Sequence, residues 1–162
     1  MDTKKIRVQR EVVRCDMCKQ PKEFIYLSDF AYGQRLIYLK NEIDFAFINL
    51  LEDDIFLEYD ALVKDIVKKN NIVCSTEEIN DFIIKSFGLA CDDIKGMKID
   101  FSIEQKRCLF CGSTKFERNM IEPENIIETE LPVVSHEEWK MLEYNQKESI
   151  ILDELKKEGI VE

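Results

Sequence analysis

Two short cysteine pairs constrain this chain more than any other feature. Cys15 and Cys18 form one Cys-x-x-Cys unit near the start, and Cys108 and Cys111 form a second unit two-thirds of the way along. Together they supply four thiolates, the number that a structural zinc ion takes in tetrahedral geometry. Gly112 directly after the second unit suits the tight turn that such a unit forms, because glycine adopts positive φ without a Cβ penalty. We therefore expect one structural zinc ion bound by these four cysteines.

The two units resemble the two knuckles of a zinc ribbon, and the resemblance covers the cysteines and the segments beside them. The knuckles of a compact ribbon lie roughly one to two dozen residues apart, whereas 89 residues (19–107) separate Cys18 from Cys108 here. The resemblance therefore implies a split ribbon, built from residues 6–28 and 98–121, with a whole subdomain inserted between its halves.

One position departs from the related iron-binding pattern. Lys19 follows the first unit, where both units of a rubredoxin usually run into glycine. This weakens an iron-carrying rubredoxin interpretation, although the sequence does not decide between zinc and iron.

Length and composition predict one folded domain, residues 1–162, in a reducing compartment. The 162 residues are 45% hydrophobic, which is enough for a core. No apolar run approaches the ~20 residues of a membrane span, and the charged N-terminus has no apolar run behind it, so we expect a cytoplasmic protein without a signal peptide. Cysteine pairs in such a protein indicate metal binding rather than disulfides. Cys74 and Cys91 are expected to be ordinary small buried residues.

Hydrophobic periodicity predicts an α+β fold. The inserted segment, 29–97, is expected to hold a β-hairpin and two helices, and a C-terminal helical segment spans 135–158. Strands are expected at 6–14, 23–28, 35–40, 43–49, 98–103 and 115–121, and an extended stretch at 126–134; helices are expected at 52–70 and 77–87.

Several local signals refine these elements. Phe45 and Phe47 share one strand face, which we expect to pack on a helix, while Ala46 and Ile48 share the other. Pro123 is expected to end a strand. Two capping boxes are predicted, Ser75 with Glu78 and Ser135 with Glu138, and the second would open either one bent helix or two short ones from His136.

The search for catalytic residues is mostly negative. His136 is the single histidine, and it is expected to be a surface or capping residue rather than a catalytic base. The five glycines are scattered, so no phosphate-binding loop is present. A zinc ion held by four thiolates has no open position for water. A deaminase would need a glutamate two residues beyond a ligand, where this chain has Gln20 and Ser113.

Acidic residues dominate the charge, and the formal net charge is −10. A stretch between residues 41 and 63 holds seven acids and no Lys or Arg. Three interpretations stay open: a solvated helix face, a patch that docks a basic protein, and a two-carboxylate metal site that would include Asp53 and Asp54. A second base-free stretch, residues 120–139, holds six acids. The acids of the first stretch are Glu42, Asp44, Glu52, Asp53, Asp54, Glu58 and Asp60.

Basic residues gather around the two cysteine units despite this acidic excess. Residues 1–23 carry seven Lys/Arg against four acids, and residues 104–118 carry four against two. They either compensate the −2 charge of a zinc–tetrathiolate centre or contact nucleic acid. The nucleic-acid alternative would use Lys4, Lys5, Arg7, Arg10, Arg14, Arg107, Lys115 and Arg118.

From these observations we expect a non-enzymatic, zinc-stabilised module that binds another protein through an acidic surface. Its size and charge are similar to those of immunity- or inhibitor-type proteins that neutralise a basic enzyme or toxin. The alternative is a transcription-related or phage-encoded zinc-ribbon regulator that binds nucleic acid. A weaker third possibility is an enzyme that uses Asp53 and Asp54.

Overall fold

The computed structural model describes residues 2–29, 31–103 and 107–161, and it has an α+β fold, as the sequence predicts. Two three-stranded antiparallel sheets are present, with strand orders β2-β1-β6 and β4-β3-β5. The elements in chain order are β1 (Thr3–Cys15), β2 (Pro21–Leu27), β3 (Gln34–Leu39), β4 (Phe45–Asn49), α1 (Asp54–Lys69), α2 (Thr76–Ser86), the 3-10 helix η1 (Phe87–Ala90), β5 (Ile99–Asp100), β6 (Phe116–Pro132), α3 (Glu137–Lys140) and α4 (Tyr144–Lys157).

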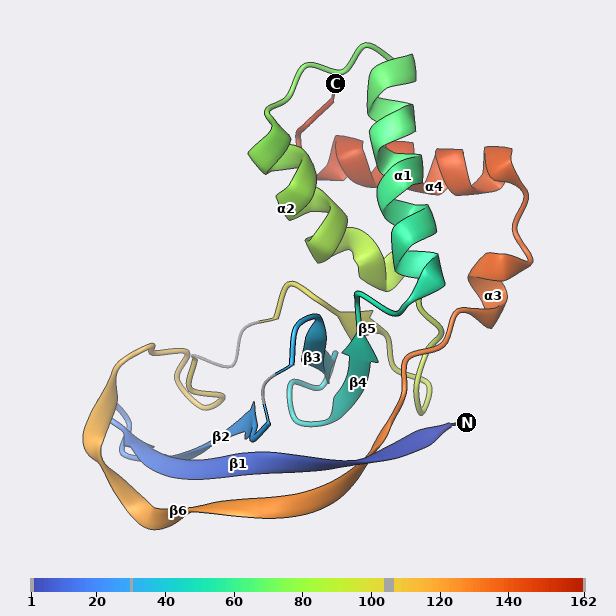
Figure 1. Cartoon of the computed structure of the whole chain (residues 1–162). Helices are drawn as coiled ribbons and strands as arrows, with labels where there is room; N and C mark the ends of the chain where they lie inside the picture. The colour runs from blue at the N-terminus through green and yellow to red at the C-terminus, as the bar shows by residue number, and fades with distance from the viewer. Residues whose placement is uncertain (1, 30, 104–106, 162) are drawn as a thin grey trace.

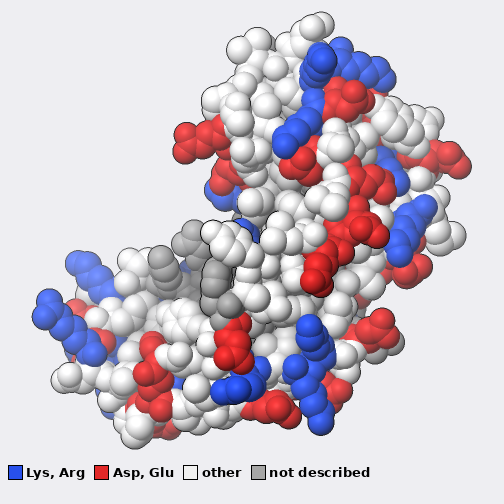
Figure 2. Space-filling view, in the orientation of Figure 1, with Lys and Arg blue, Asp and Glu red and all other residues white. Residues whose placement is uncertain are grey.

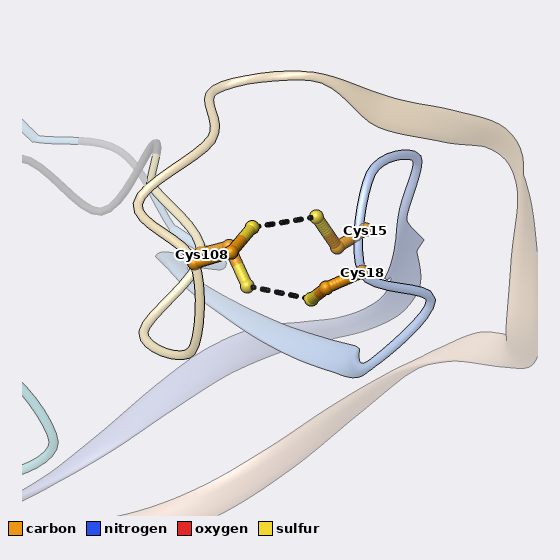
Figure 3. Close-up of side chains that lie close together, drawn as sticks. Cys15, Cys18 and Cys108 are labelled. Atoms are coloured by element: carbon orange, nitrogen blue, oxygen red, sulfur yellow. Dashed lines mark hydrogen bonds between the residues drawn. The ribbon is translucent and has the colours of Figure 1, made fainter.

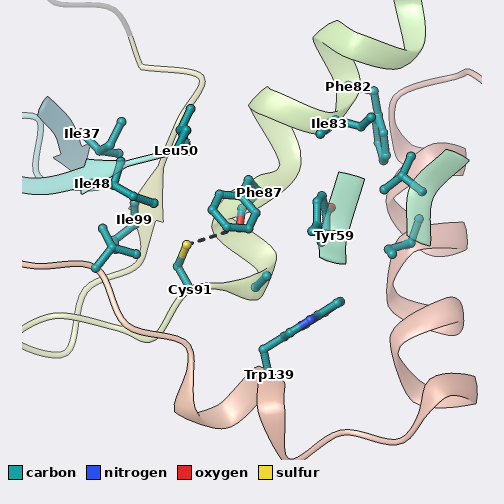
Figure 4. Close-up of a cluster of buried hydrophobic side chains, with 14 of the residues drawn as sticks. Ile37, Ile48, Leu50, Tyr59, Phe82, Ile83, Phe87, Cys91, Ile99 and Trp139 are labelled. Carbon is teal, nitrogen blue, oxygen red and sulfur yellow. Dashed lines mark hydrogen bonds between the residues drawn. The ribbon is translucent and has the colours of Figure 1, made fainter. Parts of the chain in front are cut away.

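The elements form three layers (Figure 1). Helices α1, α2 and α4 lie on one side, the β4-β3-β5 sheet lies in the middle, and the long β2-β1-β6 sheet lies on the other side. The main hydrophobic core lies between the helices and the middle sheet, where aromatic and β-branched side chains interdigitate (Figure 4). A much smaller cluster, with Ile6, Val8 and Phe47 at its centre, joins the two sheets.

Helix α1 follows directly from its sequence. Its apolar residues recur at helical spacing, so Tyr59, Val63 and Ile66 are fully buried on one face. The Asp53 side chain caps the N-terminus by accepting a hydrogen bond from the Phe56 backbone N–H. Helix α2 begins in the same way, with the Ser75 side chain accepting from the Glu78 N–H, which is one of the two hydrogen bonds of the first predicted capping box.

The face assignment of β4 was wrong. Ala46 and Ile48 belong to the core beneath the helices, whereas Phe47 packs with Ile6 and Val8 of β1. The middle sheet is covered on both faces, so its strands are apolar on both sides, and alternation alone does not show which face contacts the helices.

Strand β6 is continuous through Pro123, where the sequence predicts a break. Because β6 is an edge strand, its outer N–H groups need no partner, and proline is tolerated there. The pairing with β1 is also irregular at this point, since the register shifts between Arg10 and Val12. An irregular ladder of this kind accommodates the missing N–H.

The predicted strand at 98–103 is much shorter than expected. Only Ile99 and Asp100 form β5, and they pair with Leu39 and Tyr38 of the middle sheet rather than with the segments around the cysteines. The Asp100 side chain accepts a hydrogen bond from the Ser102 backbone N–H, which turns the chain after two residues. The rest of the path towards the second cysteine unit includes residues 104–106, which lie outside the described residues.

The C-terminal segment forms two helices, and its predicted capping box is absent. Ser135 does not cap α3; its hydroxyl donates to Asp92, which itself accepts from the backbone N–H groups of Glu137 and Glu138. Asp92 therefore caps α3 from a distant part of the chain. Helix α4 begins with a capping box of its own, formed by Glu143 and Gln146.

Candidate metal centre

The two cysteine units lie next to each other at one end of the β2-β1-β6 sheet. The first, Cys15–Cys18, forms the turn between β1 and β2, and the second, Cys108–Cys111, precedes β6. The backbone N–H of Asp16 donates to the carbonyl of Lys115 over 3.0 Å and so joins the two turns. We call these turns the first and second knuckle.

The knuckles share one backbone pattern. In the first, the N–H of Cys15 donates to Gln20 O (2.9 Å) and the N–H of Lys19 to Cys15 O (3.0 Å). In the second, the N–H of Cys108 donates to Ser113 O (2.8 Å) and that of Gly112 to Cys108 O (2.9 Å). Lys19 therefore occupies the position of Gly112, and both residues have positive φ, 63° and 76°.

This equivalence gives a prediction for the two turn positions. A non-glycine residue at positive φ is strained by roughly 1 kcal/mol. Lys19→Gly relieves this strain but also removes the exposed Lys19–Glu117 ion pair (3.1 Å), so it should raise the unfolding free energy by less than about 1 kcal/mol. Gly112→Ala should lower it by a similar amount, since open space surrounds Gly112 and only backbone strain acts. Urea unfolding of both variants measures these changes. A stabilising Gly112→Ala would show that the second turn does not require positive φ.

The four sulfur atoms form one cluster (Figure 3). All lie within 4.8 Å of one another. The Sγ–Sγ distances are 3.6 Å for Cys15–Cys111 and 3.5 Å for Cys18–Cys108. Metal–sulfur bonds of about 2.3 Å in a tetrahedron place sulfur atoms about 3.8 Å apart. The predicted ligand set is thus brought together across 90 residues of sequence, and its geometry fits one four-coordinate metal ion.

The surroundings of the cluster lower the pKa of Cys15 and Cys108. The backbone N–H of Gln20 also lowers the pKa of Cys18, but burial and the neighbouring sulfur atoms outweigh it and raise that pKa to about 12. Cys15 and Cys108 are buried, Cys18 is half-buried and Cys111 is exposed. The backbone N–H of Cys111 points at the Cys108 sulfur and, with that of Phe110, lowers the pKa of Cys108 to about 6 despite burial. The pKa of Cys15 is also lowered, mainly because the backbone N–H of Cys18 donates to its sulfur. Four thiolates this close repel one another, so a cation is the natural occupant.

Lys22 is a buried cation beside the cluster that the sequence did not single out individually. Its exposed fraction is only 7%, and its ammonium lies 5.7 Å from the centre of the Phe24 ring. Burial lowers the pKa of Lys22, while the negative charges of Glu42 and Cys108 oppose that shift. Lys22 is therefore placed to offset negative charge at the metal site.

Most arginines of the candidate nucleic-acid set are paired with carboxylates. Strand β1 carries five of the eight basic residues, spread along its length. Unlike the paired arginines, Lys4 contacts an aromatic ring: its ammonium lies 4.9 Å from the centre of the Phe47 ring. Among the described residues, Lys5, Lys115 and Arg118 have no ion pair. The pairs are Arg7–Asp29 (3.8 Å), Arg10–Glu23 (2.6 Å), Arg10–Glu122 (2.9 Å), Arg14–Glu117 (4.0 Å) and Arg107–Glu42.

The seven acids of the first acidic stretch are also mostly engaged. Glu42 pairs with Arg107, Asp53 contacts His136, and Asp44 accepts a hydrogen bond from the Asn41 side chain. Two more are in ion pairs, Glu58 with Lys147 (2.8 Å) and Asp60 with Lys64 (2.9 Å). Glu52 and Asp54 are exposed, and the described part of the chain offers neither of them an ion-pair partner.

His136 is buried rather than at the surface, and it joins three distant segments. Its Nε2 lies 2.7 Å from Asp53 Oδ2 at the start of α1, and its Nδ1 lies 2.6 Å from the Ala90 carbonyl oxygen at the end of η1. Only 6% of the His136 side chain and 12% of the Asp53 side chain are exposed. Sequence reasoning missed this pair because 83 residues separate its members and no spacing rule connects them.

Cys74 and Cys91 lie apart from the metal cluster. Cys91 is buried in the main core and donates to the Phe87 carbonyl oxygen, and Cys74 is partly buried against the same core.

Comparison of the chain with protein-family models, with curated proteins and with solved structures finds no match. Within the described residues, none of the helices combines the length and apolar character that crossing a membrane requires.

Proposed function

We propose that this protein is a zinc-stabilised module that binds a basic protein partner and has no catalytic activity of its own. The metal part of the proposal is supported by the four clustered cysteines, since thiolates in tetrahedral arrangement are the usual ligands of structural zinc. Four protein ligands leave no position for a substrate or an activated water. Zinc would tie the β1–β2 turn to the start of β6.

The partner part of the proposal rests on how the charges are distributed. With a net charge of −10, the chain has more acids than its bases can pair. Four of the five arginines in the candidate nucleic-acid set, which a nucleic-acid protein would direct at phosphates, instead contact Asp29, Glu23, Glu122, Glu117 and Glu42. Acidic and basic side chains are interspersed on the face seen in Figure 2, without an extended basic patch there. A basic protein is therefore favoured over nucleic acid.

More specifically, we propose that this chain is an immunity- or inhibitor-type protein that binds and neutralises a basic enzyme or toxin. Neutralisation of such a partner needs charge complementarity and a stable fold, and it requires no reactive group of this chain.

Affinity capture followed by measured binding tests this function. The immobilised, zinc-loaded protein is incubated with lysate, and each captured protein is purified and titrated at about 50 and 300 mM salt. We expect a basic partner with nanomolar to micromolar affinity that weakens with salt, and a further several-fold loss in Glu52→Gln/Asp54→Asn. Capture of chaperones alone would refute the proposal. A mobility shift of DNA or RNA at about 50 mM salt would favour the nucleic-acid regulator instead.

A further inference from the structure

Strand β6 has a free outer edge. It forms one border of the β2-β1-β6 sheet and pairs with β1 alone. Within the described residues, no backbone group of residues 117–131 has a backbone hydrogen-bond partner outside β1. In Figure 1, β6 runs along the outer rim of the molecule with nothing packed beyond it. Such an edge is a ready template for another strand.

The pairing register identifies the unpaired groups. Val133 N–H donates to Asp2 O over 2.9 Å, so residues 133 and 2 form a hydrogen-bonded pair. Antiparallel ladders alternate hydrogen-bonded and non-hydrogen-bonded pairs, and the register from Thr3↔Pro132 to Arg10↔Asn125 is uninterrupted. The N–H and C=O groups of Ile126, Glu128 and Glu130 therefore point outward.

The bulges and prolines limit this edge to a short segment. Register shifts disturb β6 before residue 125, and Pro132 lacks an N–H at the other end. Between them the strand is regular. Ile126 (55% accessible) and Ile127 (38%) are exposed on opposite faces, whereas Thr129 and Leu131 on the face of Ile127 are half-buried. Residues 126–130, which we call the β6 edge, are thus open to main-chain pairing.

The charges of the β6 edge favour a particular kind of strand. Glu128 lies opposite Arg7 and Glu130 opposite Lys5 in the β1–β6 ladder, so these four charged side chains share one face. A strand added beyond β6 would place its own side chains next to Glu128 and Glu130. Lysine or arginine at two alternate positions would extend the pattern of opposite charges, whereas a second copy of β6 would bring glutamates together.

We propose that the β6 edge pairs with an extended segment of a partner protein that carries Lys or Arg at alternate positions. This inference rests on the proposed binding of a basic protein and adds where and how that protein docks. Main-chain hydrogen bonds to residues 126, 128 and 130 provide affinity, and the two glutamates select a basic strand.

The test uses a fluorescent nine-residue peptide of alternating lysine and valine, titrated against the zinc-loaded protein. Controls are the glutamate–valine peptide and the lysine–valine peptide N-methylated at alternate residues. We expect measurable binding of the first peptide alone. The Ile126→Pro variant removes one outward N–H that has no partner in β1, so it should weaken binding by about tenfold or more with little change in thermal stability.

A charge swap separates pairing at the edge from general attraction. Glu128→Lys/Glu130→Lys should abolish binding of the lysine peptide and create binding of the glutamate peptide. Glu77→Lys/Asp81→Lys makes the same change of net charge on α2 and should leave lysine-peptide binding within about twofold. Equal losses in both variants, or equal binding of the N-methylated peptide, would overturn the inference. So would a dimer in native mass spectrometry that Ile126→Pro dissociates, since a second copy would then occupy the edge.

The proposed function and this inference fail in different ways. A captured basic partner whose affinity is unchanged in Ile126→Pro would refute docking at the β6 edge and leave the proposed function standing. Absence of any basic partner, together with specific peptide binding at the edge, would refute the function and retain a strand-pairing site.

Discussion

The Cys108→Ser variant is expected to lose its metal and the order of the β2-β1-β6 sheet around the knuckles, while the helices remain folded. The reason is an uneven distribution of buried side chains. The helices and the middle sheet share the large core, whereas the small cluster around Ile6, Val8 and Phe47 lies at the opposite end of β1 from the cysteines. Zinc binding contributes of order 10 kcal/mol in small zinc peptides. At this end the buried apolar side chains of Val12, Val13 and Phe24 lie outside both clusters, and they are too few to replace it.

Hydrogen exchange read by mass spectrometry, with metal content from native mass spectrometry, measures this effect. We expect one zinc per chain in the wild type and none in the variant. Protection should fall in residues 11–24 and 108–122 and persist in α1 and α2. Chelator treatment of the wild type should reproduce the pattern.

Cys74→Ser is the control, because it removes a thiol that lies apart from the cluster. It should retain its zinc and the full exchange protection. Unchanged thermal stability in Cys108→Ser would mean that the four cysteines do not hold a metal. Loss of protection in every helix would mean that the metal supports the whole fold.

The second large effect concerns the buried His136–Asp53 pair. Both ring nitrogens face acceptors, the Ala90 carbonyl oxygen and the Asp53 carboxylate, so both must donate and the imidazole is positively charged. Burial alone would lower the pKa of His136, but its hydrogen bonds to Asp53 and Ala90 and the nearby charge of Asp92 raise it above 6.5. For Asp53, burial alone would raise the pKa, but the His136 bond and the Phe56 N–H lower it.

The signs of these shifts fix the pH dependence. A raised folded-state pKa of His136 stabilises the fold fully below about pH 6.5, and this stabilisation is lost as pH rises through the folded pKa. The lowered pKa of Asp53 stabilises the fold above about pH 4 and is lost as pH falls through its folded value. The pair therefore contributes most between about pH 4 and 6.5.

Urea unfolding of wild type and His136→Gln across pH 5–9 tests this pH dependence. The difference between the two unfolding free energies at each pH cancels the separate pH dependence of metal binding. We expect the variant to be less stable by about 3–5 kcal/mol near pH 6, since it leaves a buried carboxylate without its cation. The difference should shrink at higher pH. A difference that stays constant across the range would show that His136 is neutral in the folded protein.

Asp53→Asn provides a second, milder variant. Asparagine still caps α1, so the loss of stability should be smaller than in His136→Gln, and the pKa of His136 measured by NMR should fall. An unchanged pKa of His136 would contradict the charged pair.

Features set by local sequence could be predicted, and those set by distant partners could not. Helix α1 was expected at 52–70 and is found at Asp54–Lys69, because its apolar stripe and its N-terminal acids act within the helix. The four cysteines were predicted to cluster because their spacing within each knuckle is a property of the metal rather than of the fold.

The errors have a common physical origin. Ser135 and Glu138 have the residue types of a capping box, but Asp92 takes over the capping because the tertiary fold brings it to that helix end. Phe47 faces β1 rather than a helix because a second sheet covers its side of β4. Pro123 lies within a strand because its outer side has no neighbour. In each case the deciding group is remote in sequence.

The split ligand set has a consequence for the order of assembly. Cys18 and Cys108 enclose 89 residues (19–107), so an ion bound by the four cysteines would close a large ring of covalent and coordinate bonds. Closing a ring of about 100 residues costs an unfolded chain roughly 4–5 kcal/mol of entropy. In the folded protein the core already holds the two knuckles together, so metal binding does not meet this entropy cost. Metal affinity therefore reports on the integrity of distant helices: a substitution that loosens α1 or α2 should weaken zinc binding without touching a ligand.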